Sequence, residues 1–173
     1  MVEFIKADRS QKADMIDFIT YVFSYDHEPH EFKRLVPKVY ADDAEDTGMT
    51  HYMAVEDGRI KAVVSHRVME EKIGGEILHY GLIGAVSVHP YARGKGYMKT
   101  LINMAMADAR RDGMDVLVLG GQRQRYGYFG FNAAGIALAI FIGAIIGFFL
   151  PAGLAHSPKV HKGFDLYSAA LPI

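Results

Sequence analysis

The stretch VSVHPYARGKGYM, at residues 86–98, decides the fold of this chain. A strand pattern ends at Pro90, and Gly94 and Gly96 then allow a tight turn before a helical pattern begins. Consecutive backbone N–H groups and the positive end of that helix would face one point in space. Arg93 and Lys95 add positive charge at the same point. The stretch therefore predicts a site for a pyrophosphate or a similar anion.

The residues on either side of this stretch predict a single α/β domain. Asp57-Gly58 and Gly74-Gly75 are hairpin signals, which make the middle of the chain an antiparallel meander. The expected elements are a strand at 2–6, a helix around 15–23, a short helical stretch at 31–38 interrupted by Pro37, strands at 51–56, 60–69 and 76–88, a helix at 94–111 and a strand at 115–119.

Two ordered motifs resemble those of the GNAT N-acetyltransferases. The family signature Q/R-x-x-G-x-G/A corresponds here to Arg93, Gly96 and Met98, and YGYFGF at 126–131 matches the pattern Y-x-x-F-G-F. Met98 stands where Gly or Ala is usual, as a bulky residue also does in the branch of the enhanced-intracellular-survival (Eis-like) aminoglycoside acetyltransferases. The resemblance covers residues 1–131 and implies a mixed, mostly antiparallel, twisted sheet flanked by helices.

The resemblance implies transfer of the acetyl group of acetyl-CoA to a primary amine, with an aminoglycoside, a polyamine or a lysine side chain as the acceptor. By resemblance, strand backbone would hydrogen-bond the pantetheine arm, provided that a bulge or splay leaves its N–H groups unpaired. The alternative is a non-catalytic acyl-CoA-binding or membrane-tethered interaction module. The predicted cofactor-binding residues are Val86, Ser87, Val88, Arg93, Gly94, Lys95, Gly96, Tyr97 and Met98.

Acetyl transfer from a thioester needs a proton donor for the thiolate and a proton acceptor for the amine. Tyr126 is the predicted catalytic acid, because a phenol with a pKa of about 10 is protonated at neutral pH. Tyr128 competes for that role, and both rings could instead cap the core. Asp26, His27 and Glu28 follow the first helix, where similar proteins hold the acceptor, and which of them acts as the base is open.

Composition excludes several other classes of protein. The 173 residues carry 19 Lys and Arg against 20 Asp and Glu, so the charge balance favours no nucleic acid partner. The chain has no cysteine, and its histidine pairs at 27–30 and 156–161 lack helical spacing and a third ligand, so no metal is predicted. Residues 1–6 lack a secretory pattern, which predicts a cytoplasmic protein. The oligomeric state is left open.

The last quarter of the chain departs from the resemblance. Residues 132–173 form a separate apolar tail beside the 1–131 core, with only three charges, at Lys159, Lys162 and Asp165. The uncharged run 133–155 fits two further strands of the same sheet, with alternation at 135–142, or an apolar helix that would associate with a membrane. A third interpretation is a segment that is extraneous to the domain.

Overall fold

The computed structural model describes residues 1–25, 28–41, 48–73, 75–133 and 168–170. Within them the chain forms one sheet in the order β1-β2-β3-β4-β5-β7-β6, with short helices before and after its central strands. The elements are β1 (Val2–Lys6), η1 (Arg9–Gln11), α1 (Lys12–Ser24), α2 (Phe32–Leu35), α3 (Pro37–Tyr40), β2 (Met49–Glu56), β3 (Arg59–Ile73), β4 (Glu76–Val88), η2 (Pro90–Ala92), α4 (Tyr97–Arg111), β5 (Val116–Leu119), α5 (Arg123–Tyr126), η3 (Gly127–Phe129), β6 (Asn132–Ala133) and β7 (Ser168–Ala170).

The sheet confirms the predicted fold class. Strands β1 to β4 pair antiparallel in chain order, β5 pairs parallel to β4, and β7 pairs antiparallel to both β5 and β6. The hairpin between β2 and β3 turns at Asp57 and Gly58, whose φ angles of 52° and 72° are the two positive values that such a tight turn requires. The prediction of a meander followed by a helix and a central strand is therefore correct.

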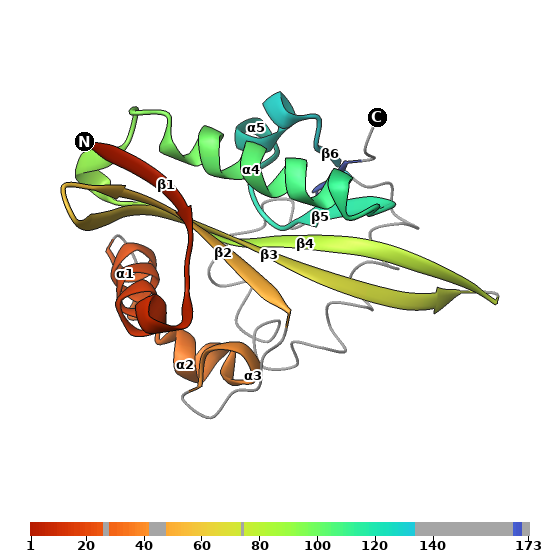
Figure 1. The fold of residues 1–173 in the computed structure, drawn as a ribbon, viewed down its shortest axis with the longest axis horizontal. Helices are drawn as coiled ribbons and strands as arrows, with labels where there is room; N and C mark the ends of the chain where they lie inside the picture. Colours follow the sequence, from red (N-terminus) through yellow and green to blue (C-terminus); the bar gives the residue numbers. More distant parts are fainter. Residues whose placement is uncertain (26–27, 42–47, 74, 134–167, 171–173) are drawn as a thin grey trace.

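Helices cover both faces of the sheet (Figure 1): α1, α2 and α3 lie on one face and α4 and α5 on the other. On the first face Ile19 of α1 packs with Met53 and Val63 of the sheet. On the second, Leu101 of α4 packs with Leu119 of β5. All five side chains are almost completely buried, which contributes roughly 1.5–3 kcal/mol each to folding.

An ion-pair cluster ties α4 to β1 and β2. Lys6 of β1 lies 2.6 Å from Asp108 of α4, and the Tyr52 hydroxyl donates to the same carboxylate at 2.6 Å. Burial alone would raise the pKa of Asp108, but the hydrogen bonds from Lys6 and Tyr52 lower it to about 2. The carboxylate is therefore charged at neutral pH and holds the helix in register on β1 and β2.

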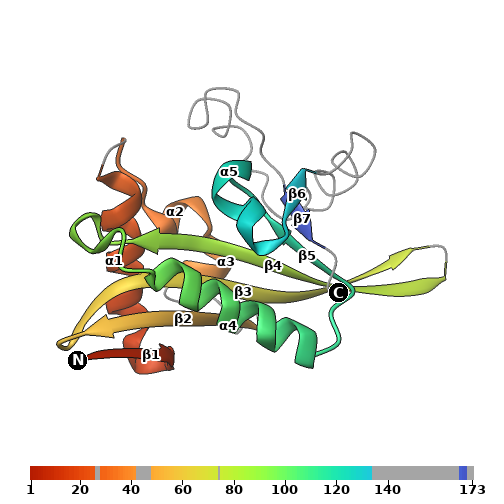
Figure 2. The same ribbon diagram turned by 90° about the horizontal axis from the view of Figure 1, so that it is seen from above.

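Three predicted boundaries shift for local reasons. The helix expected from residue 94 begins at Tyr97, because Gly96 takes a left-handed conformation (φ 81°) as its N-cap. The stretch 31–38 splits into α2 and α3 at Val36, immediately before Pro37, where helical backbone is disfavoured. The hairpin of β3 and β4 continues to Ile73, beyond the expected residue 69, and projects past the rest of the sheet (Figure 2).

Two short strands of the 132–173 segment join the sheet. Ser168–Ala170 pairs with Leu117–Leu119 of β5, and Asn132–Ala133 pairs with β7. The predictions for 135–142, and for 133–155 beyond Ala133, lie outside the described residues. Among the residues that the structure does describe, no helix is both long and apolar enough to cross a membrane.

Candidate active site

Strands β4 and β5 separate near the end of β4, which leads into the loop that carries Arg93, Gly94 and Gly96 (the signature loop). Their parallel pairing starts at Tyr80 with Val116 and ends at Ile83 with Leu119. Beyond Ile83, β4 continues for five residues to Val88, while the chain after β5 turns away into α5, as Figure 2 shows. The edge of β4 at residues 84–88 therefore has β3 on one side and no strand on the other among the described residues.

A β-bulge lies at this point of separation. Pairing shifts from Ser65 with Gly84 to Val63 with Ser87. The two β4 residues Ala85 and Val86 therefore oppose the single β3 residue between Val63 and Ser65. Ala85 has a φ of 47°, in the left-handed region that L residues rarely adopt. A bulge or a splay is the condition under which N–H groups of a strand stay unpaired, and both occur here.

The backbone at the end of β4 presents an N–H donor to the edge that has no neighbouring strand among the described residues. The N–H of His89 bonds to Lys61 of β3 at 2.8 Å. Because donors alternate along a strand, the N–H of Val88 faces the opposite edge, where β5 is absent. The Val86 and Val88 side chains pack into the core beneath α4, and the Ser87 hydroxyl contacts the Val63 carbonyl at 3.5 Å on the other face.

The loop between β4 and α4 turns at two glycines before the helix, as the sequence predicts. Gly94 and Gly96 have φ angles of 84° and 81°, and a side chain on either would be strained. Arg93 and the three residues after it are exposed. The α4 helix of 15 residues starts directly after them, so its first N–H groups point out of the loop.

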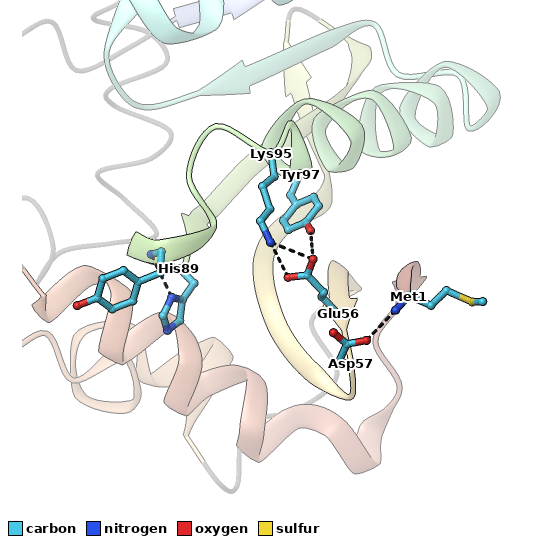
Figure 3. A network of polar contacts seen from close by, with 7 residues as sticks. Met1, Glu56, Asp57, His89, Lys95 and Tyr97 are labelled. Carbon is cyan, nitrogen blue, oxygen red and sulfur yellow. Dashed lines mark hydrogen bonds and ion pairs between the residues drawn. The ribbon is translucent and has the colours of Figure 1, made fainter.

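Two predicted cofactor residues direct their side chains elsewhere. Lys95 Nζ lies 2.9 and 3.0 Å from the two carboxylate oxygens of Glu56, at the end of β2. The hydroxyl of the buried Tyr97 donates to Glu56 at 2.8 Å (Figure 3). These bonds from Lys95 and Tyr97 lower the pKa of Glu56. Lys95 and Tyr97 therefore fasten the loop to the end of β2 through Glu56.

The same turn also holds the amino terminus. The Met1 ammonium lies 2.7 Å from the Asp57 carboxylate, next to the Glu56 cluster in Figure 3. The His89 ring, at the start of η2, accepts from the Tyr91 N–H at 3.3 Å. The His89–Tyr91 contact stabilises the start of the loop that carries Arg93, Gly94 and Gly96.

Tyr126 lies at the end of α5, in the segment that follows β5. Its ring is 6% exposed and belongs to the same apolar cluster as Val86 and Val88. Burial raises the pKa of its phenol, which stays protonated at neutral pH. Tyr126 thus combines a ring in the apolar core with a protonated phenol.

Tyr128, the competing tyrosine, has a different environment. It is 73% exposed, and its hydroxyl accepts from Lys99 Nζ at 2.6 Å. The Lys99 ammonium also lies 4.6 Å from the centre of the Tyr128 ring. Tyr128 is therefore a surface residue paired with a lysine of α4.

The predicted acceptor residues follow α1. Glu28 is exposed, and the backbone beside it is held to the helix because the His30 N–H bonds to the Ser24 hydroxyl at 2.9 Å. Asp26 and His27 lie outside the described residues. The helix itself packs against β3 and β4, on the face opposite α4. No group of three His, Asp or Glu residues that could hold a metal occurs in the described ranges.

Sequence reasoning missed three features of this site. The Ala85 bulge and the Lys99–Tyr128 pair have no local sequence signal. Gly121, which follows β5, was also overlooked: a Cβ there would lie 2.7 Å from the Tyr126 ring. A glycine five residues before the candidate acid could have pointed to this close approach.

Comparison with known proteins identifies the family of this chain and structures that share its fold. The model of the acetyltransferase (GNAT) domain family matches residues 3–134. A GNAT family acetyltransferase from Brucella melitensis, solved with acetyl-CoA, is 24% identical over 77% of this chain and 84% of its own, with a TM-score of 0.63. A predicted acetyltransferase from Clostridium acetobutylicum, also with acetyl-CoA, is 15% identical over 79% and 93%, with a TM-score of 0.66.

A probable N-acyltransferase from Enterococcus faecalis is 17% identical over 77% of this chain, with a TM-score of 0.64, and the chain spans 33% of that protein. No curated protein matches the sequence closely. With the family model covering most of its length, this chain belongs to the GNAT acetyltransferases and is an acetyl-CoA-dependent N-acetyltransferase. Neither the family model nor these structures name the Eis-like branch.

Proposed function

We propose that this chain transfers the acetyl group of acetyl-CoA to a primary amine by direct attack while both substrates are bound. The observation that carries the proposal is the open edge of β4 at residues 84–88, between the signature loop and Tyr126. Pantetheine would lie along this edge and accept from the Val88 N–H. The pyrophosphate would bind the N–H groups from Gly94 to Met98, with Arg93 beside them.

Each step of the transfer has a group to serve it. The amine nitrogen attacks the thioester carbon, the C–S bond breaks, and the phenolic proton of Tyr126 passes to the departing thiolate. An N–H group of the bulged strand, in the range 86–88, would donate to the oxygen of the intermediate. The amine gives its proton to a base among Asp26, His27 and Glu28.

The acceptor class follows from the resemblance to the Eis-like branch and from charge. An aminoglycoside, a polyamine or a lysine side chain is a cation at neutral pH, and acidic residues after α1 suit a cation. Glu28 is exposed and follows the helix that packs against β4.

A thiol-release assay with acetyl-CoA and a panel of amines tests the proposal. Tyr126→Phe should keep the affinity for CoA and lower kcat on the order of a hundredfold, because general acid catalysis contributes roughly 10²–10⁴-fold. Tyr128→Phe is the matched control and should keep a larger share of kcat. An unchanged kcat in Tyr126→Phe would remove Tyr126 from the mechanism. Binding of CoA without release by any amine would leave a non-catalytic acyl-CoA-binding module.

A further inference from the structure

Two polar side chains in the middle of the sheet have buried donor atoms without a hydrogen-bond partner. They are Nε of Arg67, on β3, and the hydroxyl of Tyr80, on β4. Tyr80 is only 4% exposed, so its hydroxyl is shielded from water. A buried donor without a partner destabilises a fold, because it has lost its bonds to water and has gained none in return. Both donors would gain a partner if a ligand bound beside them.

Arg67 and Tyr80 are diagonal neighbours on one face of the sheet. Arg67 pairs with Leu82 across β3 and β4, and Met69 pairs with Tyr80. Side chains at such diagonal positions share a face, and their backbones lie about 7–8 Å apart, which a long side chain and a ring can span. Burial, and to a smaller extent Glu71, raises the pKa of the Tyr80 phenol, and the nearby Arg67 charge opposes that rise. One ligand can therefore contact both groups.

The charge of Arg67 selects an anion as that ligand. In the part of the chain that the structure describes, Arg67 forms no ion pair with Glu71 or with any other carboxylate. Beside it, Tyr80 packs in an apolar cluster with Leu82 and Val118. Apolar surroundings strengthen the attraction between opposite charges, and the fork of donors on a guanidinium matches a carboxylate or a phosphate.

The Arg67–Tyr80 pair lies beside the opening between β4 and β5, on the face opposite α4. Val63, four residues before Arg67 on β3, packs with α1, so strand alternation places Arg67 on the face that carries α1, α2 and α3 (Figure 1). Leu82, the partner of Arg67, pairs with Val118 one residue before the β4–β5 ladder ends. A molecule that enters the opening from this face would meet Arg67 at the base of the opening.

We propose that Arg67 and Tyr80 bind an anionic group, a carboxylate or a phosphate, carried by the amine that accepts the acetyl group. This inference rests on the proposed function and narrows its acceptor. Polyamines and aminoglycosides are cations without such a group, whereas free lysine carries an α-carboxylate together with its side-chain amine. The acceptor then places its amine at the thioester and its anion at Arg67.

Two pairs of amines that differ by one anionic group test the inference. Lysine differs from cadaverine by an α-carboxylate, and O-phosphoethanolamine differs from ethanolamine by a phosphate. In the thiol-release assay the wild type should favour the anionic member of one pair by roughly tenfold or more in kcat/KM, as expected for a charge-assisted hydrogen bond. The pair that shows the preference identifies the anion. Equal kcat/KM values within both pairs would overturn the inference.

Substitution of Arg67 separates recognition from a structural effect. Arg67→Gln should lower kcat/KM for the favoured anionic amine roughly tenfold and leave that for its counterpart without the anion unchanged. Tyr80→Phe should act in the same selective way, severalfold. Arg110→Gln, on the exposed surface of α4, is the matched control for loss of one positive charge and should change neither value. An Arg67→Gln variant that slows both amines equally, or that keeps the preference, would contradict the assignment.

Binding to the chain saturated with CoA gives a readout that does not depend on turnover. Calorimetric titration should show the favoured anionic amine binding roughly tenfold tighter than its counterpart, with the difference lost in Arg67→Gln. The Tm of Arg67→Gln should be no lower than that of the wild type, because the substitution removes an unbalanced charge. A lower Tm with the preference retained would assign Arg67 to the fold alone. Absence of thiol release with every amine would refute the proposed function, whereas release without a preference would refute this inference alone.

Discussion

Replacing Gly121 by alanine should impair catalysis by displacing the Tyr126 ring. The new Cβ would lie 2.7 Å from Cε2 of Tyr126, whereas ordinary contacts begin near 3.4 Å. The ring must therefore move by roughly 0.7 Å, and displacements near 1 Å cost up to about a hundredfold in rate. We expect kcat to fall roughly tenfold or more while the KM for acetyl-CoA changes little.

The Gly121 substitution also strains the backbone, so stability must be measured beside activity. Gly121 has a φ of 151°, which an L residue rarely adopts, and the strain should cost about 1–3 kcal/mol of unfolding free energy. Gly127→Ala is the matched control, because its φ is −56° and no atom lies within 4 Å of the added Cβ. Thermal unfolding and CoA titration confirm that each variant is folded.

The assay is steady-state thiol release with a saturating amine. If displacement of the phenol is the cause, Gly121→Ala combined with Tyr126→Phe should be no slower than Tyr126→Phe alone. A folded Gly121→Ala that binds CoA and turns over at the wild-type rate would refute the reasoning, as would a further rate loss in the double variant.

Two other outcomes are expected. Burial, with a smaller contribution from Lys12, lowers the pKa of His51 to about 4 in the folded chain, below its usual value of about 6.5. The unfolded chain binds more protons between these values, so unfolding free energy should fall by up to about 3 kcal/mol as the pH drops from about 6.5 to 4. Denaturant titrations at several pH values should show that the unfolding free energy of His51→Gln depends less steeply on pH than that of the wild type. An equally steep dependence on pH would contradict the assignment. A chain ending at Phe131 should be less soluble than the full chain, because removing β7 exposes the edge of β5 at 117–119; equal solubility in buffer would count against a structural role for β7.

Local sequence signals predicted the elements that depend on local conformation. The turn at Asp57-Gly58 needs two positive φ values, and those residue types supply them whatever surrounds them. The loop at Gly94 and Gly96 formed as expected for the same reason. The apolar period of residues 97–111 specified which face of α4 is buried.

Features that depend on distant partners could not be predicted. The contact of Lys95 with Glu56, which lies 39 residues earlier, forms only when β2 is paired in the sheet. The bulge at Ala85 arises from the register between β3 and β4, which no pattern within β4 specifies. The Lys99–Tyr128 contact likewise joins α4 and η3, which are brought together by the fold.

The account depends on one chemical event, which is transfer of acetyl from the thioester to an amine nitrogen. The most direct measurement incubates the full chain with acetyl-CoA and each amine of the panel, then quantifies free CoA thiol and N-acetylated amine by mass spectrometry. The account predicts one acetylated amine for each thiol released, with both strongly reduced in Tyr126→Phe. Thiol release without an acetylated amine, or no product with any amine despite CoA binding, would contradict it.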